Sequence, residues 1–109
     1  MSFEIFKKMM EFDLRGQFCL EIFFSVIGSE KFSSCWMGKM PDPETKDDCF
    51  WYGLTPDCLN AFDYKTFEEF AAAPVFDGKS LADIWALIKI DSINGCDPAD
   101  MLPIYVPEN

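Results

Sequence analysis

The segment 73–80, APVFDGKS, has the spacing of a phosphate-binding loop, in which a small residue and four spacers precede Gly-Lys-Ser. In such a loop the backbone N–H groups hold phosphates, the lysine balances their charge and the serine binds magnesium. This chemistry requires a strand before the loop and a helix after it. Residues 66–73, TFEEFAAA, instead have a helical cap and good helix formers, and Pro74 removes a backbone donor. We therefore expect no nucleotide cofactor.

The same segment is better interpreted as a joint between two helices. Pro74 ends the first helix, and Phe76 enters the core. Gly78 follows an aspartate and accepts a positive φ in a turn. Ser80 caps the next helix, and Lys79 points to solvent. The structural residues predicted from this segment are Pro74, Phe76, Gly78 and Ser80.

Thiol and imidazole chemistry is limited by the composition, since the chain has five cysteines and no histidine. Catalysis by a self-contained Ser–His or Cys–His pair is therefore excluded. The cysteines have long spacings and no C-x-x-C pair, so neither a metal site nor an even disulfide framework is expected. We expect reduced and mostly buried thiols, as in a cytoplasmic protein. The five are Cys19, Cys35, Cys49, Cys58 and Cys96.

Acidic residues dominate the charge, with 19 Asp and Glu against nine Lys and Arg and a formal net charge of −10. This charge repels phosphate backbones and anionic lipids, so neither nucleic acid nor membrane is an expected partner. Residues 1–13 lack the continuous apolar run of a signal peptide, and no apolar stretch is long enough for a spanning helix, so neither is expected. Acidic loops at 41–48 and 91–100 lack the calcium-binding register, so solvated loops are expected there. A carboxylate pair could serve as acid and base, but spacing singles out none.

Aromatic residues offer the best candidates for a binding surface. Residues 49–55, CFWYGLT, are expected to form a strand, in which neighbouring side chains point to opposite faces. One of Trp51 and Tyr52 then faces away from the core and could anchor a protein or sugar, unless the C-terminal tail covers it. The candidate binding residues are Trp36, Trp51 and Tyr52, with Asp47 and Asp48 of the acidic loop.

Hydrophobic periodicity predicts the elements that position these residues. Residues 18–27 alternate with period 2, and residues 31–40 return after a Gly-Ser-Glu turn, which indicates an antiparallel hairpin. Ser2 is expected to cap the first helix. Thr66 opens one capping box, and Ser80 with Asp83 opens another. The expected helices are 3–12, 66–73 and 80–88 with a last helical turn from 97; the expected strands are 18–27, 31–40, 49–55 and a short one at 88–93; the tail from 102 is expected to be extended.

Together these features predict a single α+β domain over residues 1–109, with an antiparallel sheet of three to five strands under two or three helices on one face. The expected function is non-catalytic. A small acidic domain would bind another macromolecule, or itself, through an acidic and aromatic surface, in an inhibitor, immunity-type or adaptor role. The alternative is a small-ligand or enzymatic domain with a carboxylate-lined pocket.

Overall fold

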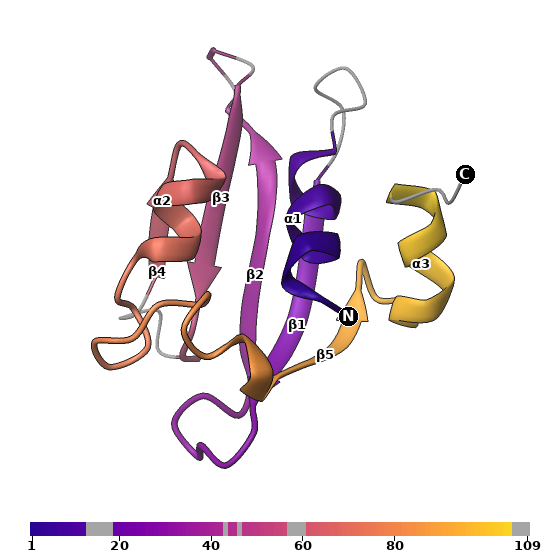
Figure 1. Ribbon diagram of the computed structural model, residues 1–109. Helices are drawn as coiled ribbons and strands as arrows, with labels where there is room; N and C mark the ends of the chain where they lie inside the picture. The colour runs from indigo at the N-terminus through magenta and orange to yellow at the C-terminus, as the bar shows by residue number, and fades with distance from the viewer. Residues whose placement is uncertain (13–18, 43, 46, 57–60, 106–109) are drawn as a thin grey trace.

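A computed structural model describes residues 1–12, 19–42, 44–45, 47–56 and 61–105. It shows an antiparallel five-stranded sheet with three α-helices in one small α+β domain, as the sequence predicts (Figure 1). The strands are β1 (Leu20–Val26), β2 (Cys35–Pro41), β3 (Asp48–Gly53), β4 (Ala61–Tyr64) and β5 (Ile88–Ile93). The helices are α1 (Phe3–Glu11), α2 (Phe67–Ala72) and α3 (Pro98–Tyr105), with a short 3-10 helix, η1 (Trp85–Leu87). Cys58 lies outside the described residues. Of the four described cysteines only Cys35 is buried, so the expectation of mostly buried thiols is wrong.

The order of the strands is β4-β3-β2-β1-β5. The first four strands follow one another as a meander, and β5 returns to pair with β1 at the opposite edge from β4. The connection from β4 to β5 therefore spans the width of the sheet and carries α2 and η1 with it. None of the helices in the described part of the chain has the length and apolar character needed to cross a bilayer.

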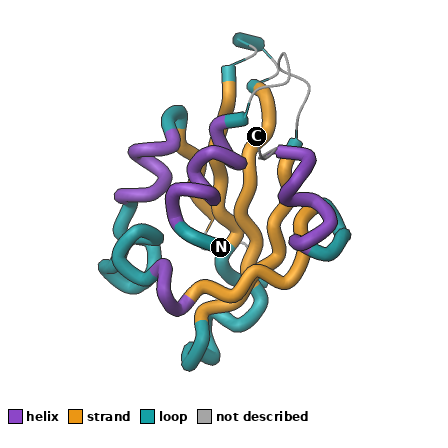
Figure 2. The backbone as a smooth tube through the Cα atoms, turned by 45° about the vertical axis from the view of Figure 1, so that its right-hand side comes forward, coloured by secondary structure: helices purple, strands orange, loops and turns teal. Residues whose placement is uncertain are grey.

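The core lies between one face of the sheet and the helices. In β1 the alternate residues Leu20, Ile22, Phe24 and Val26 are buried, as the period-2 pattern predicts. They belong to the same buried cluster as Phe6, Met9 and Met10 of α1 and Phe67 and Phe70 of α2. Figures 1 and 2 show α1 and α2 lying over the sheet and α3 beside β5.

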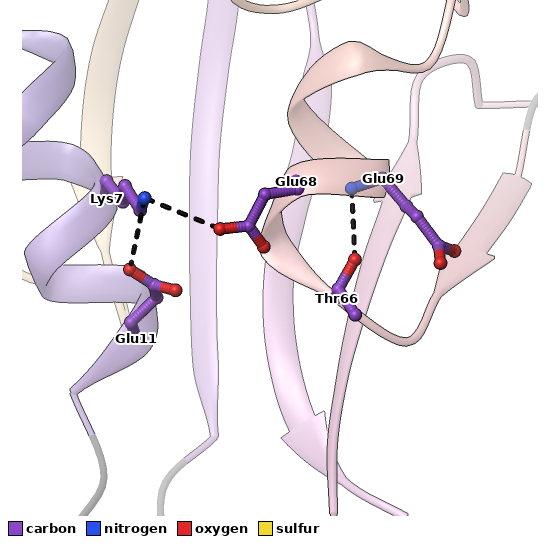
Figure 3. Close-up of polar contacts among 5 residues, drawn as sticks. All are labelled: Lys7, Glu11, Thr66, Glu68 and Glu69. Atoms are coloured by element: carbon purple, nitrogen blue, oxygen red, sulfur yellow. Dashed lines mark hydrogen bonds and ion pairs between the residues drawn. The ribbon is translucent and has the colours of Figure 1, made fainter.

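Polar caps begin the first two helices at the residues that the sequence predicts. The Ser2 hydroxyl accepts a hydrogen bond from the Ile5 N–H at 3.1 Å, and Thr66 accepts one from the Glu69 N–H at 3.1 Å (Figure 3). The two helices lie next to each other, and Lys7 of α1 reaches Glu68 of α2 at 3.5 Å.

The segment 73–80 has neither the strand before it nor the helix after it that a phosphate-binding loop requires. Pro74 follows the C-cap of α2, and Phe76 is buried. Phe76 and Lys79 exchange both backbone hydrogen bonds, at 3.0 and 3.1 Å, around a two-residue turn. Gly78 occupies this turn with φ of +90°, so its predicted need for a positive φ is confirmed. Lys79 is exposed, as predicted.

Ser80 makes the predicted capping box. Its hydroxyl accepts from the Asp83 N–H at 3.1 Å, and the Asp83 carboxylate accepts from the Ser80 N–H at 3.2 Å. The helix expected over residues 80–88 is nevertheless wrong, because turns and η1 occupy this segment. Pairing with β1 overrides the helical pattern: Ile88 already lies opposite Val26, and the Leu87 carbonyl accepts from the Ile27 N–H at 2.8 Å.

Three further expectations need correction. The tail from Leu102 was expected to be extended, but α3 continues to Tyr105, and Asp97 starts this helix by accepting from the Ala99 N–H at 2.8 Å. Strand β4, Ala61–Tyr64, has no counterpart among the expected elements. The second strand of the hairpin begins at Cys35 rather than at residue 31, because the Phe32 N–H bonds to the Ser29 hydroxyl in a longer connection.

Candidate functional site

The two faces of the sheet differ in what covers them. Side chains of β1 to β3 alternate between the buried core and the opposite surface, which we call the open face. Trp36 and Met40 on the open face expose 41% and 45% of their surface. In β1 to β4 the open face comprises Glu21, Phe23 and Ser25 of β1, Trp36, Gly38 and Met40 of β2, Cys49, Trp51 and Gly53 of β3, and Ala61 and Asp63 of β4.

Aromatic rings pack against one another at the centre of the open face. Phe23 and Trp36 are cross-strand partners, and their ring centroids lie 4.9 Å apart. Trp51 lies opposite Gly38 on the neighbouring strand. A Cβ atom added at Gly38 would lie 1.8 Å from the Leu20 carbonyl oxygen and 2.9 Å from the Trp51 ring. The absence of a side chain at Gly38 therefore lets the Trp51 ring lie against β2.

An acidic cleft of about 600 Å³ adjoins the open face at β3 and β4. Cys49 and Asp63 belong to both, and Asp63 is the cross-strand partner of Trp51. Burial raises the pKa of the Cys49 thiol, and the nearby Asp63 and Asp42 carboxylates raise it further. The cleft is lined by Asp42, Thr45, Asp47, Asp48, Cys49, Asp63, Tyr64 and Lys65.

The structure brings four of the five candidate binding residues to this surface. Trp36 and Trp51 lie on the open face, and Asp47 and Asp48 line the cleft beside it. Tyr52 points the other way, so its prediction as a binding residue is wrong. It is buried, its ring stacks on Phe70 with centroids 4.1 Å apart, and its hydroxyl donates to the Phe70 carbonyl at 2.6 Å. Burial raises the pKa of this hydroxyl above its ordinary range, so Tyr52 is a neutral core residue.

Lys39 is a buried charge that the sequence reasoning missed. It exposes 1% of its surface, and its Nζ lies 3.6 Å from an Asp48 carboxylate oxygen and donates to the Phe12 carbonyl. Asp48, one of the candidate binding residues, therefore also pairs with the buried Lys39. The signal was the alternation in CWMGKM, which places Lys39 on the same side as Cys35 and Met37.

Neither a metal centre nor a relative indicates a function. Among the residues that the structure describes, no group of three or more His, Cys, Asp or Glu side chains is arranged to hold a metal ion. Comparisons of the chain with protein-family models, curated proteins and solved structures found no match.

Proposed function

We propose that this protein is a non-catalytic binding domain that docks another protein on the open face of its sheet. The observation that supports this proposal is the apolar patch formed by Phe23, Trp36, Met40 and Trp51, in which Trp36 and Met40 are exposed and the other two are half-buried. Large exposed apolar residues that adjoin one another are typical of interaction surfaces, and tryptophan is enriched among the residues that dominate binding energy. An inhibitor, immunity-type or adaptor role would fit such a surface.

The charge of the chain favours a protein over other macromolecules. A formal charge of −10 opposes the approach of nucleic acids and anionic membranes. We also propose that the domain acts in the cytoplasm, because the four cysteines that the structure describes are free thiols.

Capture from the source cells followed by direct measurement tests the docking surface. The wild-type chain, a Trp36→Ala/Met40→Ala variant and an Ile104→Ala control are used as bait, since Ile104 is an exposed apolar residue of α3 and not of the sheet. A protein held by the wild type and the control is then purified and its affinity measured by calorimetry. We expect the open-face variant to bind at least about tenfold more weakly than the control. Equal affinities of the two variants would contradict the proposal.

The acidic cleft supports a second candidate, a small-ligand or enzymatic domain. Among the described residues, four aspartates line it beside Tyr64, in a volume within the range of small-molecule sites. Such a domain would bind a small cation such as spermidine in the cleft. Thermal unfolding with spermidine would then show a rise in melting temperature that Asp63→Asn reduces and Glu4→Gln, on the helical side, does not. A rise that is the same in both variants would reflect general charge attraction and would count against this candidate.

A further inference from the structure

We infer that the protein docked on the open face is basic, and that it sets lysine or arginine side chains against the edge of the face formed by β3 and β4. This inference rests on the proposed function, because it names the chemistry of the partner at the same surface. It commits to a cationic protein surface rather than to a second copy of this chain.

The charge around the open face is distributed unevenly. At the β3–β4 side, four of the described residues that line the cleft are aspartates and one, Lys65, is a lysine. Lys39 is buried on the core side of the sheet and pairs with Asp48, so it offsets the charge of only that one carboxylate of the four. On the opposite edge, Lys89 of β5 lies 3.6 Å from Asp91. The open face thus has an aromatic centre with a negative border on one side.

Trp51 and Asp63 lie where these two regions meet. They are direct cross-strand partners, so an indole ring and an exposed carboxylate occupy adjacent positions on one surface. A guanidinium group binds a carboxylate through paired hydrogen bonds and also stacks on an aromatic ring. An ammonium group gains from the same two contacts with less directionality. The pair therefore matches a cationic side chain, while Trp36 and Met40 match its apolar neighbours.

Pairing of two copies through this face would be opposed by the same charges. A twofold contact places one surface against itself, so it would bring the acidic borders of both copies into one dimer. Each chain in that dimer carries a formal charge of −10, and the two chains would repel each other. A partner with basic residues beside apolar ones gains attraction where a second copy meets repulsion. Electrostatic complementarity of this kind also speeds association at low salt.

Fluorescence anisotropy with a labelled peptide of alternating leucine and arginine tests the inference. The matched probe alternates leucine and glutamine. Asp47→Asn/Asp63→Asn removes two negative charges beside the open face, and Glu4→Gln/Glu69→Gln removes two from the helical layer, so the two variants have equal net charge. Thermal unfolding confirms that each variant is folded before it is titrated.

We expect the arginine probe to bind the wild type at least about tenfold more tightly than the glutamine probe. The aspartate variant should weaken binding of the arginine probe at least about fivefold, and the glutamate variant less than about twofold. Equal weakening by the two charge variants would overturn the inference, because the attraction would then belong to the acidic chain as a whole.

Trp36→Ala separates failure of this inference from failure of the proposed function. If Trp36→Ala weakens the arginine probe and the aspartate variant does not, docking on the open face stands and the basic partner is wrong. If neither changes the affinity, the docking surface itself is wrong. Sedimentation equilibrium gives the remaining outcome: a dimer that Trp36→Ala dissociates would identify a second copy as the occupant and overturn the inference.

Discussion

Neighbouring residues of one strand serve opposite purposes in this protein. Phe24 of β1 is fully buried beneath the helices, whereas Phe23 lies on the open face and packs against Trp36. The buried face is covered by helices of the same chain. The open face has large apolar residues at its centre and no covering helix among the described residues. Such a surface is costly in water unless a partner covers it, and this contrast is the reason for assigning it a binding role.

The largest expected effect comes from comparing these two phenylalanines. Phe24→Ala should lower the free energy of unfolding by about 3–5 kcal/mol, because it leaves a cavity in the core. Phe23→Ala should lower it by about 1 kcal/mol, since its half-buried ring loses a cross-strand contact without leaving an enclosed void. Chemical denaturation of both variants gives the two values. Similar losses would show that the open face is as well packed as the core.

Gly38 tests how closely the strands of the open face approach one another. Gly38→Ala should destabilise the domain by about 1–3 kcal/mol, because the new methyl group would collide with the Leu20 carbonyl and the Trp51 ring. Gly53→Ala is the control, since its nearest contact would be at 3.9 Å, and a change within about 0.5 kcal/mol is expected there. A tolerated Gly38→Ala would mean that β1 does not approach β2 this closely at Gly38.

The smallest expected effect lies in the joint between α2 and β5. Ser80→Ala should cost about 1 kcal/mol by removing the acceptor for the Asp83 N–H. Hydrogen bonds from Ser80 lower the pKa of the Asp83 carboxylate below its ordinary value of 3.8. Its contribution is therefore present above that pH and is lost as the pH falls through the lowered pKa. Urea titrations at pH 6 and in strong acid should show Asp83→Asn losing less stability on acidification than the wild type. An equal loss would contradict the hydrogen-bonded carboxylate.

Local signals predicted much of the fold. The alternation in β1, the caps at Ser2 and Thr66, and the Gly78 turn are each determined by residues a few positions apart. Long-range pairing decided the rest. The amphipathic pattern after Ser80 indicates a helix, but the Ile88–Ile93 segment completes the sheet beside β1, 62 or more residues earlier in the chain. Strand β4 is short and lacks a sequence signal. It forms because its backbone pairs with the edge of β3.

The candidate site was predictable in its residue types but not in its orientation. Alternation shows that Trp51 and Tyr52 face opposite ways, yet it does not say which face the helices cover. Tyr52 is turned inward because α2 brings Phe70 against its ring. The cleft also depends on long-range pairing, since β4 places Asp63 beside Trp51.

The three tryptophans allow the most direct test of the binding role. Trp36 and Trp51 lie on the open face, whereas the Trp85 indole packs on Phe6 with centroids 4.6 Å apart and donates to the Met1 carbonyl at 3.0 Å. Their indole N–H signals can be followed in one nitrogen–proton correlation spectrum while the alternating Leu–Arg peptide is added. We expect the Trp36 and Trp51 signals to shift in a saturable way and the Trp85 signal to stay in place. A shift of Trp85 with Trp36 and Trp51 unchanged would contradict docking on the open face.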